Sequence, residues 1–350
     1  MAATEASPGP RRGEPGWIMF GEIAEQPDVL RRVLREGAPA IRHTARRIAA
    51  RQPRFVLLSA RGSSDHAALY AKYLVEIELG LPCGLTAMST TTVYGAEPRL
   101  ADVLLITVSR SGGSPELAAS TQAAREAGAI TLAVTNNADS PLAEVAEFHV
   151  DLLAGREKAL PATKTYTAEL LALYLLVTAL RGDDGSAADA LPDLADEVLA
   201  RGAEIRRLAG RYRSAERMVL TSRGYGYPTA REGALKLMET SYIPALAYSG
   251  SDLLYGPLAM VDAISPVVAI VPGGRGGQAL QPVLDRLRVR GADLVVIGSR
   301  LQVAGACDGF ALPAGHLPEA LQPVLEILPL QRLAHEIAVA RGQNPDAPTA

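Results

Sequence analysis

The chain has 350 residues, of which 48% are hydrophobic and 21% are charged, and its formal net charge is −3 at pH 7. These values are typical of a globular protein of about two domains, and they argue against a disordered, membrane or nucleic-acid-binding protein. No apolar run is long enough for a membrane span or a secretion signal. Cys83 and Cys307 lack the spacing of a zinc site or a disulfide framework. They fit a reducing compartment, so we expect a cytoplasmic protein.

An internal duplication organises the chain. Residues 55–62 (FVLLSARG) are similar to residues 218–224 (MVLTSRG) at an offset of 162, and residues 128–134 are similar to residues 291–297 at an offset of 163. Because two separate pairs of similar segments have nearly the same offset, two copies of a strand-helix unit are favoured over chance similarity. Alternating strands and helices predict an α/β fold, in which each copy forms a parallel sheet with helices on both faces.

The domain boundaries follow from these two copies and from local composition. The segment 1–15 is polar and rich in Pro and Gly, which predicts a disordered tail. The predicted divisions, in chain order, are a tail at 1–15, a helical lead-in at 16–39, domain 1 at 40–182, a linker helix at 183–207, domain 2 at 208–342 and a short tail at 343–350.

The most informative segment is 108–114 (VSRSGGS), which directly follows the apolar run 103–107. The apolar run predicts a buried parallel strand, and residues 116–125 have helix-forming composition. The segment therefore lies at a helix N-terminus, where backbone N–H groups, glycines and serine hydroxyls favour a phosphate. The alternative is an ordinary turn in which Ser114 caps the helix. The residues alone leave both interpretations open.

A second polar loop follows the first predicted strand. In open parallel sheets, ligands bind outside the carboxyl ends of the strands, where the strand order reverses, so we expect the two loops to converge. The candidate phosphate ligands are Gly62, Ser63, Ser64, Ser109, Arg110, Ser111 and Ser114, with Arg61 as a further charged partner. In the second copy, residues 271–277 (VPGGRGG) replace the serines by glycines. We therefore expect only the first copy to bind the anion.

Four separated motifs carry a resemblance to a known family, and they are RGSSDHA at 61–67, SRSG at 109–112, ATKTY at 162–166 and EGALKLME at 232–239. From about residue 19 to 348, the chain resembles the tandem SIS (sugar isomerase) family. It is most similar to the second class of glucosamine-6-phosphate deaminases, and slightly less to the isomerase half of glucosamine-6-phosphate synthase. The resemblance implies two three-layer αβα, flavodoxin-like domains, a homodimer and a hexose 6-phosphate ligand without a metal or organic cofactor. It adds Leu160 and Thr163 to the substrate-binding residues.

The resemblance also identifies Glu239 as the catalytic base. Moving a carbonyl between C1 and C2 of a sugar requires a group that carries a proton, and a carboxylate suits this role. Lys236 and Glu232 share the helical face of Glu239, and Lys236 can stabilise charge beside the base. The alternative is that these three residues form a solvated salt-bridge stripe. With the resemblance, we favour the catalytic interpretation.

Two departures from the family affect ring opening. Tyr255 stands where the family has a histidine before Gly-Pro, and a phenol is a poorer general base at pH 7 than an imidazole. The sequence also stops just before the tail that carries a substrate-contacting lysine in the synthase, which indicates either a truncated sequence or a protein that never forms the imine. We also expect that no glutaminase domain precedes it. We therefore expect an amino-sugar phosphate deaminase or isomerase. The alternatives are a deglycase-type enzyme acting on an open-chain sugar-amine conjugate and a non-catalytic sugar-phosphate sensor.

Overall fold

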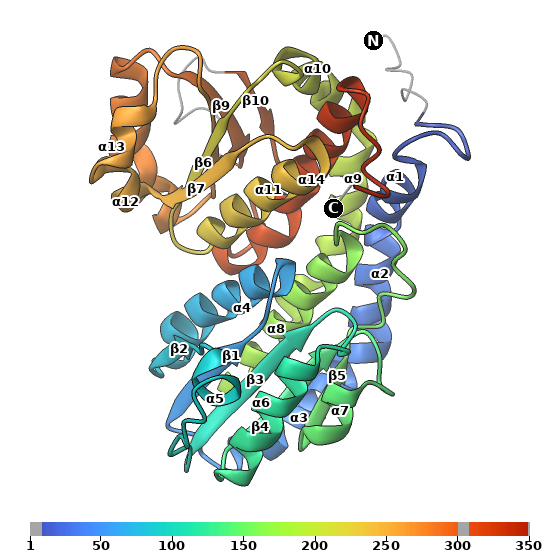
Figure 1. Ribbon diagram of the computed structural model, residues 1–350, viewed down its shortest axis with the longest axis vertical. Coiled ribbons are helices and arrows are strands. Elements are labelled where there is room, and N and C mark those ends of the chain that lie inside the picture. Colours follow the sequence, from blue (N-terminus) through green and yellow to red (C-terminus); the bar gives the residue numbers. More distant parts are fainter. Residues whose placement is uncertain (1–8, 300–307, 349–350) are drawn as a thin grey trace. The chain divides into compact units, whose positions relative to one another are not determined.

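The computed structural model describes residues 9–299 and 308–348 (Figure 1). The chain divides into two compact units. The first-repeat unit contains Asp28–Arg156 and Lys164–Asp189. The second-repeat unit contains Met1–Pro27, Glu157–Thr163 and Ala190–Ala350, apart from the undescribed residues.

The first-repeat unit is built on a five-stranded parallel sheet in the order β2-β1-β3-β4-β5. The strands are β1 (Phe55–Ser59), β2 (Cys83–Leu85), β3 (Val103–Ser109), β4 (Ile130–Thr135) and β5 (Phe148–Asp151). The α-helices are α2 (Gln26–Arg32), which crosses the unit boundary, α3 (Ala38–Ala49), α4 (Ser63–Leu74), α5 (Ser89–Thr92), α6 (Pro115–Glu126), α7 (Pro141–Val145) and α8 (Lys164–Arg181). Short π-helical turns at Val33–Gly37 and Val75–Leu79 and a 3₁₀ turn at Ser186–Ala188 complete it. β3 and β4 are buried along their whole length, as apolar central strands of a parallel sheet must be.

The second-repeat unit has a sheet of the same kind, in the order β10-β9-β8-β6-β7. The strands are β6 (Met218–Ser222), β7 (Ala245–Ser249), β8 (Pro266–Val271), β9 (Asp293–Gly298) and β10 (Asp308–Ala311). The α-helices are α1 (Trp17–Ala24), α9 (Leu191–Ala200), α10 (Gly202–Tyr212), α11 (Gly226–Ser241), α12 (Gly250–Leu254), α13 (Arg275–Val289) and α14 (Gln322–Ala340). Two 3₁₀ turns lie at Pro257–Met260 and Glu319–Leu321.

The strand orders confirm the predicted α/β fold of two parallel-sheet domains. When the second sheet is read from its β7 edge, its order is β7-β6-β8-β9-β10, which matches the order β2-β1-β3-β4-β5 of the first sheet. Each sheet therefore reverses its strand order at one point, between β1 and β3 and between β6 and β8. This order is the flavodoxin-like one, in which ligands bind outside the carboxyl ends of the strands at the reversal point.

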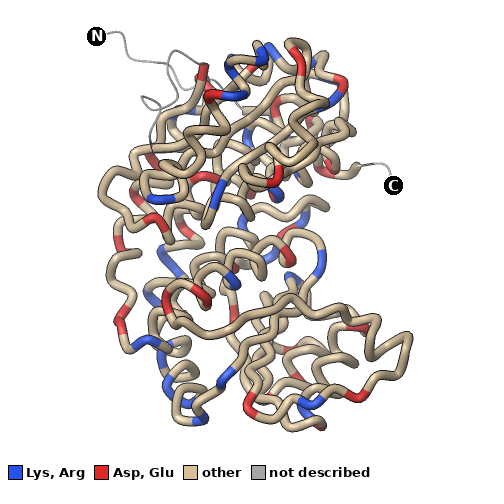
Figure 2. Tube along the Cα trace, turned by 90° about the vertical axis from the view of Figure 1, so that its left-hand side faces the viewer, with Lys and Arg blue, Asp and Glu red and all other residues tan. Residues whose placement is uncertain are grey.

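Two central helices form much of the core. α8 packs against α3 and α4 in the first-repeat unit, and α14 packs against α10 and α11 in the second-repeat unit (Figure 1). Both helices are buried around most of their circumference, which explains their apolar sequences. None of the helices in the described ranges combines the length and apolar content that a membrane span needs. Figure 2 shows basic and acidic residues interspersed along the chain.

The structure divides the chain differently from the predicted boundaries in several places. The predicted linker helix at 183–207 is two helices, because the backbone of Arg201 interrupts the α-helix between α9 and α10. Residues 157–163, predicted as part of domain 1, pack with the second-repeat unit. Of the predicted tail, residues 1–8 lie outside the described residues, whereas Gly9–Pro15 contain a turn in which the N–H of Glu14 donates to Arg11. Cys307 also lies outside the described residues.

Candidate functional site

The segment Ser109–Ser114 forms a tight turn between β3 and α6. Its shape depends on Gly112, whose φ of +63° lies in the left-handed region. A Cβ atom at this position would be 2.1 Å from Oγ of Ser140, so the turn fits closely against the start of α7. The carbonyl of Gly112 also accepts a hydrogen bond from the N–H of Leu142. The turn is therefore a fixed structure that admits only glycine at this point.

The serines of this turn hold its backbone. Backbone N–H groups donate to all three predicted ligand hydroxyls, from Gly112 to Ser109 (3.2 Å), from Gly113 to Ser111 (3.2 Å) and from Leu117 to Ser114 (3.4 Å). A hydroxyl has one proton and two acceptor positions, so each serine that accepts here can still donate its proton to an anion. Ser114 is the N-cap of α6, as the alternative interpretation of this segment expected. Capping and phosphate binding are compatible in this geometry.

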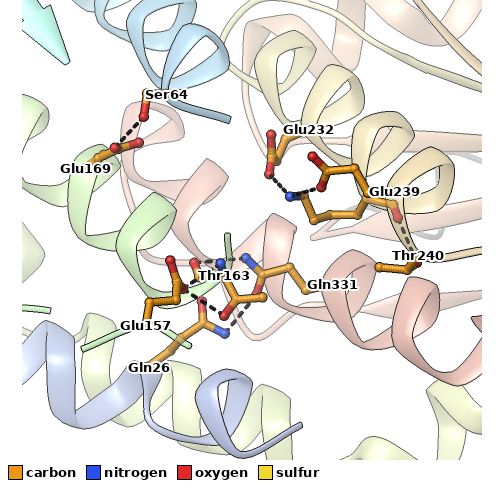
Figure 3. A network of polar contacts seen from close by, with 10 residues as sticks. Gln26, Ser64, Glu157, Thr163, Glu169, Glu232, Glu239, Thr240 and Gln331 are labelled. Atoms are coloured by element: carbon orange, nitrogen blue, oxygen red, sulfur yellow. Dashed lines mark hydrogen bonds and ion pairs between the residues drawn. The ribbon is translucent and has the colours of Figure 1, made fainter. Parts of the chain in front are cut away.

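The loop after β1 lies beside this turn at the reversal point of the sheet, since β1 and β3 are neighbours. Gly62 has a φ of +61°, and α4 begins at Ser63. Ser64 faces the interior, where its hydroxyl donates to Oε1 of Glu169 on α8 at 2.7 Å (Figure 3). The proton of Ser64 therefore stabilises a buried carboxylate, which leaves only its oxygen lone pairs and backbone for a ligand. This limits the role predicted for Ser64.

The two arginines near these loops differ in their surroundings. Arg61 forms an ion pair with Glu116 in the first turn of α6, and this hydrogen bond lowers the pKa of the Glu116 carboxyl. Thr92 also donates to Glu116, at 3.1 Å. Arg61 is thus paired with its own chain and does not point a free charge at the turn. Arg110 is half-buried within the turn, and its carbonyl accepts from the N–H of Asn136.

On α11, the structure brings Glu232, Lys236 and Glu239 together. Nζ of Lys236 lies 2.6 Å from Oε2 of Glu239 and 3.2 Å from Oε1 of Glu232 (Figure 3). Burial by itself lowers the pKa of Lys236, but the two carboxylates outweigh it, and the pKa is raised. Lys236 therefore stays charged and links the two carboxylates.

Burial decides between the two interpretations of this group. The side chains of Glu232 and Lys236 are fully buried, whereas that of Glu239 is 36% exposed. A solvated salt-bridge stripe is therefore excluded, because two of its three members have no access to water. Glu239 is the member that a ligand can reach, and the buried ammonium fixes its position. This arrangement suits a carboxylate that carries a proton.

Tyr255, predicted to stand in for a ring-opening histidine, follows the short helix α12 and is 87% exposed. Tyr255, Lys236 and Glu239 all belong to the described part of the second-repeat unit. Within that part, the hydroxyl of Tyr255 makes no hydrogen bond to Lys236 or Glu239. Gly256 beside it has a φ of +123°, which turns the chain sharply after Tyr255. The phenol therefore faces solvent and is not joined to the ion pair of α11.

Leu160 and Thr163 lie in the segment that packs with the second-repeat unit. Leu160 is exposed, and its N–H donates to the carbonyl of Asp346. Thr163 is buried, and both its N–H (2.8 Å) and its hydroxyl (3.2 Å) donate to Oε1 of Glu157. Its carbonyl accepts from Nε2 of Gln331 on α14 (Figure 3). The side chain of Thr163 is thus used in a structural network, and Leu160 is the more accessible of the two predicted ligands.

Sequence reasoning missed three polar residues that position the predicted ones: Glu169, Glu157 and Gln331. Glu169 and Gln331 are buried polar side chains on the two central helices, α8 and α14. Such residues within apolar helices usually have a specific partner, which is the signal that could have identified them. Within the described ranges, no group of three His, Cys, Asp or Glu side chains could hold a metal ion.

Comparison with known proteins extends these observations. The chain is 34% identical to a glutamine–fructose-6-phosphate aminotransferase (isomerizing) of Pseudomonas putida and 32% identical to one of Thermococcus kodakarensis, each over 95% of this chain. It spans only 57% and 56% of the length of these relatives.

Solved structures show the same relationship. A candidate phosphosugar isomerase from Silicibacter pomeroyi DSS-3 is 33% identical, with a TM-score of 0.82 over 95% of this chain and 100% of that chain. The C-terminal domain of glucosamine-fructose-6-phosphate aminotransferase from Francisella tularensis is 25% identical, with a TM-score of 0.85 over 94% of this chain and 98% of that chain. A glucosamine-6-phosphate deaminase from Thermotoga maritima, at 19% identity and a TM-score of 0.73 over 94% of this chain and 97% of that chain, shares the fold. The SIS domain family matches residues 51–179, which contain β1 to β5, and residues 211–303, which contain β6 to β9. The chain belongs to the SIS domain family.

Proposed function

We propose that this chain binds a hexose 6-phosphate and moves a proton between C1 and C2 of the open-chain sugar. The phosphate would be held by the turn Ser109–Ser114, whose hydroxyl protons can still donate to an anion. Glu239 would carry the proton. The observation that supports this most strongly is the buried Lys236, which links the inaccessible Glu232 to the accessible Glu239.

The chemistry requires this kind of group. An aldose–ketose conversion removes a proton from one carbon and returns it to the neighbouring carbon through an enediolate, so a single carboxylate can perform both steps. Lys236 places a positive charge 2.6 Å from that carboxylate, and this charge holds it in one orientation. A nearby cation also stabilises the negative charge that develops on the substrate oxygens. The names of the relatives, which refer to phosphosugar isomerisation or to amination of fructose 6-phosphate, support this class of reaction.

As the specific reaction, we propose conversion of glucosamine 6-phosphate to fructose 6-phosphate with release of ammonia. The second candidate is the same proton transfer on an open-chain conjugate of a sugar phosphate and an amine. The exposed Tyr255, which is not joined to the ion pair of α11, favours this alternative, because an open-chain substrate needs no ring-opening base. We also infer a homodimer from the family, and sedimentation of the purified chain would test it.

The decisive experiment incubates the full chain with glucosamine 6-phosphate and measures ammonia and fructose 6-phosphate together. We expect equal amounts of both products, and we expect Glu239→Gln to lower turnover by about 10² to 10⁴-fold with little change in binding. Glu204→Gln is the matched control, since Glu204 also pairs with a basic residue three positions away, Arg201, but lies on α10. Turnover that Glu239→Gln leaves unchanged would exclude the proposed base. Binding without turnover would direct the search to open-chain conjugates.

The phosphate position has its own test. Ser111→Ala removes one hydroxyl proton from the turn, and we expect it to weaken hexose phosphate binding by about 3 to 10-fold, the usual range for one hydrogen bond. Ser120→Ala is the control, because Ser120 lies on α6 and bonds the carbonyl of Leu117 outside the turn. Equal affinities of the wild type and Ser111→Ala would contradict this placement.

A further inference from the structure

The second sheet also has a reversal point, between β6 and β8, and its loops converge there. The turn after β8, Pro272–Gly276, lies against the loop after β6, since a Cβ atom at Gly276 would be 2.5 Å from the carbonyl oxygen of Arg223. By sheet order and position, this turn is the counterpart of Ser109–Ser114, and it leads into the 15-residue helix α13. It contains none of the serines of the first turn.

A carboxylate of the chain occupies this turn. Oε2 of Glu319 accepts from the N–H of Arg275 at 2.7 Å, and Oε1 accepts from the N–H of Gly276 at 2.8 Å. The N–H of Gly273 donates to Oε1 of Gln322 at 2.6 Å. Two consecutive N–H groups at a helix N-terminus that share the two oxygens of one anionic group reproduce the geometry in which such termini bind phosphate.

Two glycines of the turn leave room for the carboxylate of Glu319 that a larger residue would not leave. A Cβ atom at Gly274 would lie 1.9 Å from Oε2 of Glu319, and one at Gly276 would lie 2.6 Å from Oε1. Both distances are shorter than any van der Waals contact. Side chains at these positions would therefore displace the carboxylate, whereas glycines let its oxygens approach the backbone.

A second carboxyl group lies at the same reversal point. Glu326, on the first turns of α14, is completely buried, and neither of its oxygens has a hydrogen-bond partner among the described residues. A Cβ atom at Gly226, the first residue of α11, would be 3.4 Å from Oε2 of Glu326. Burial, assisted by the charge of Glu319, raises the pKa of Glu326 to about 8. A carboxyl that is protonated at neutral pH is a hydrogen-bond donor, which is the group that an oxyanion requires from its site.

We propose that the turn after β8 is a second oxyanion site of phosphate type, which the chain fills with the carboxylate of Glu319. Glu319 thereby excludes inorganic phosphate and phosphate esters from the second repeat. The statement that phosphate binds only in the first repeat rests on the proposed function. The existence of the second site does not depend on the proposed function.

The test uses the full chain and inorganic phosphate as the probe. Thermal unfolding is measured in increasing sodium phosphate, with sodium chloride at matched ionic strength as the baseline, for the wild type and Glu319→Ala. Asp285→Ala is the matched control, because it removes a surface carboxylate from α13, the helix whose first N–H groups donate to Glu319, and Asp285 there pairs with Arg288. We expect phosphate to raise the melting temperature of Glu319→Ala by about 2 °C or more beyond its effect on the other two proteins. Equal shifts in all three proteins overturn the proposal.

A second variant covers the case in which Glu319→Ala does not fold in chloride. Glu319→Gln keeps the size of the side chain and removes its charge, and we expect the same additional stabilisation by phosphate. Recovery of folded protein from either variant only when phosphate is present supports the proposal. Failure of phosphate to restore folding in both variants overturns it.

Titration calorimetry separates this inference from the proposed function. We expect Glu319→Ala to bind one more phosphate per chain than the wild type, and we expect the double variant Ser111→Ala/Glu319→Ala to retain that additional site. A wild type that binds no phosphate, together with a Glu319→Ala variant that does, would remove the proposed role of the first turn and keep the second site. The reverse result would remove the second site and keep the first.

Discussion

The helix that follows the first strand of each repeat, α4 in the first and α11 in the second, carries different kinds of side chain at equivalent positions. At the offset of the duplication, Glu232, Lys236 and Glu239 on α11 correspond to Tyr70 and Leu74 at the end of α4 and to Ile77 just beyond it. The burial pattern is the same in both helices, with the first two positions buried and the third accessible. In the first repeat these positions hold apolar or aromatic side chains, and in the second they hold a buried ion pair and an accessible carboxylate. A common scaffold therefore provides a packing position in one copy and candidate chemistry in the other.

The turns before α6 and α13 also differ between the repeats, but here the first repeat has the site that is open to a ligand. In the first repeat, neutral serine hydroxyls accept the N–H groups of the turn after β3 and keep their protons for a ligand. In the second repeat, a carboxylate and an amide from residues near α14 accept them. The first turn can bind an added anion, whereas the second already contains one. The candidate chemistry and the candidate anion site thus lie in different repeats.

The largest expected effect concerns the buried ion pair. Lys236→Met would leave the carboxylate of Glu232 buried without its cation, and we expect a loss of about 3–5 kcal/mol in the free energy of unfolding. The double variant Glu232→Gln/Lys236→Met should recover much of this loss, because the first repeat accommodates Tyr70 and Leu74 at these positions. Urea denaturation measures both values. If Lys236→Met and the double variant have equal stability, the uncompensated carboxylate is not the cause.

The turn of the first repeat should be the next most sensitive feature. Gly112→Ala imposes a side chain at a φ of +63° and 2.1 Å from Oγ of Ser140, and we expect a loss of about 2 kcal/mol in the free energy of unfolding. Gly113→Ala is the control, since its φ is not positive and a Cβ atom there would lie 3.4 Å from its nearest neighbour. Denaturation midpoints of the two variants give the comparison. Equal losses would mean that the backbone conformation of Gly112 is not the cause.

Much of this architecture could be predicted from local patterns. The apolar run 103–107 predicted β3, the composition of 116–125 predicted α6, and Ser114 is the N-cap that this kind of turn favours. The repeated segments predicted two parallel sheets, one in each copy. In each case the information lies within a few residues, because strand burial, helix composition and capping depend on neighbouring positions in the chain.

The residues that could not be predicted make contacts over long sequence distances. Glu319 reaches back to a turn that precedes α13 and β9 in the chain, and Glu169 pairs with Ser64 from the other end of its unit. Periodicity on α11 placed Glu232, Lys236 and Glu239 on one face, but it could not show whether that face is exposed to solvent or buried. Thr163 matched a family motif, but its hydroxyl bonds Glu157, a contact that depends on how the segment packs. Tertiary packing decided all of these cases.

A smaller effect is expected at the unpaired carboxyl of the second repeat. Glu326 has its pKa raised from 4.5 to about 8, so the folded chain binds a proton that the unfolded chain releases between these pH values. The stability that this proton provides is complete below about pH 4.5 and is lost as the pH rises to about 8. Glu326→Gln does not titrate, and we therefore expect its stability relative to the wild type to improve by more than about 1 kcal/mol as the pH rises from 5 to 8. Melting temperatures across this range would test it, and a difference independent of pH would contradict it.

The variant with the smallest expected effect makes the first repeat resemble the second. Ser64 and Gly226 are equivalent positions at the offset of the duplication, and only Ser64 provides a hydroxyl to the buried carboxylate on the last helix of its unit. Ser64→Ala removes this donor from Glu169, and we expect a loss of about 1 kcal/mol in the free energy of unfolding. Urea denaturation of the two proteins measures this loss. Ser63→Ala, at the neighbouring half-buried position, is the control. A loss no greater than that of Ser63→Ala would indicate that the hydrogen bond from Ser64 to Glu169 does not stabilise this position.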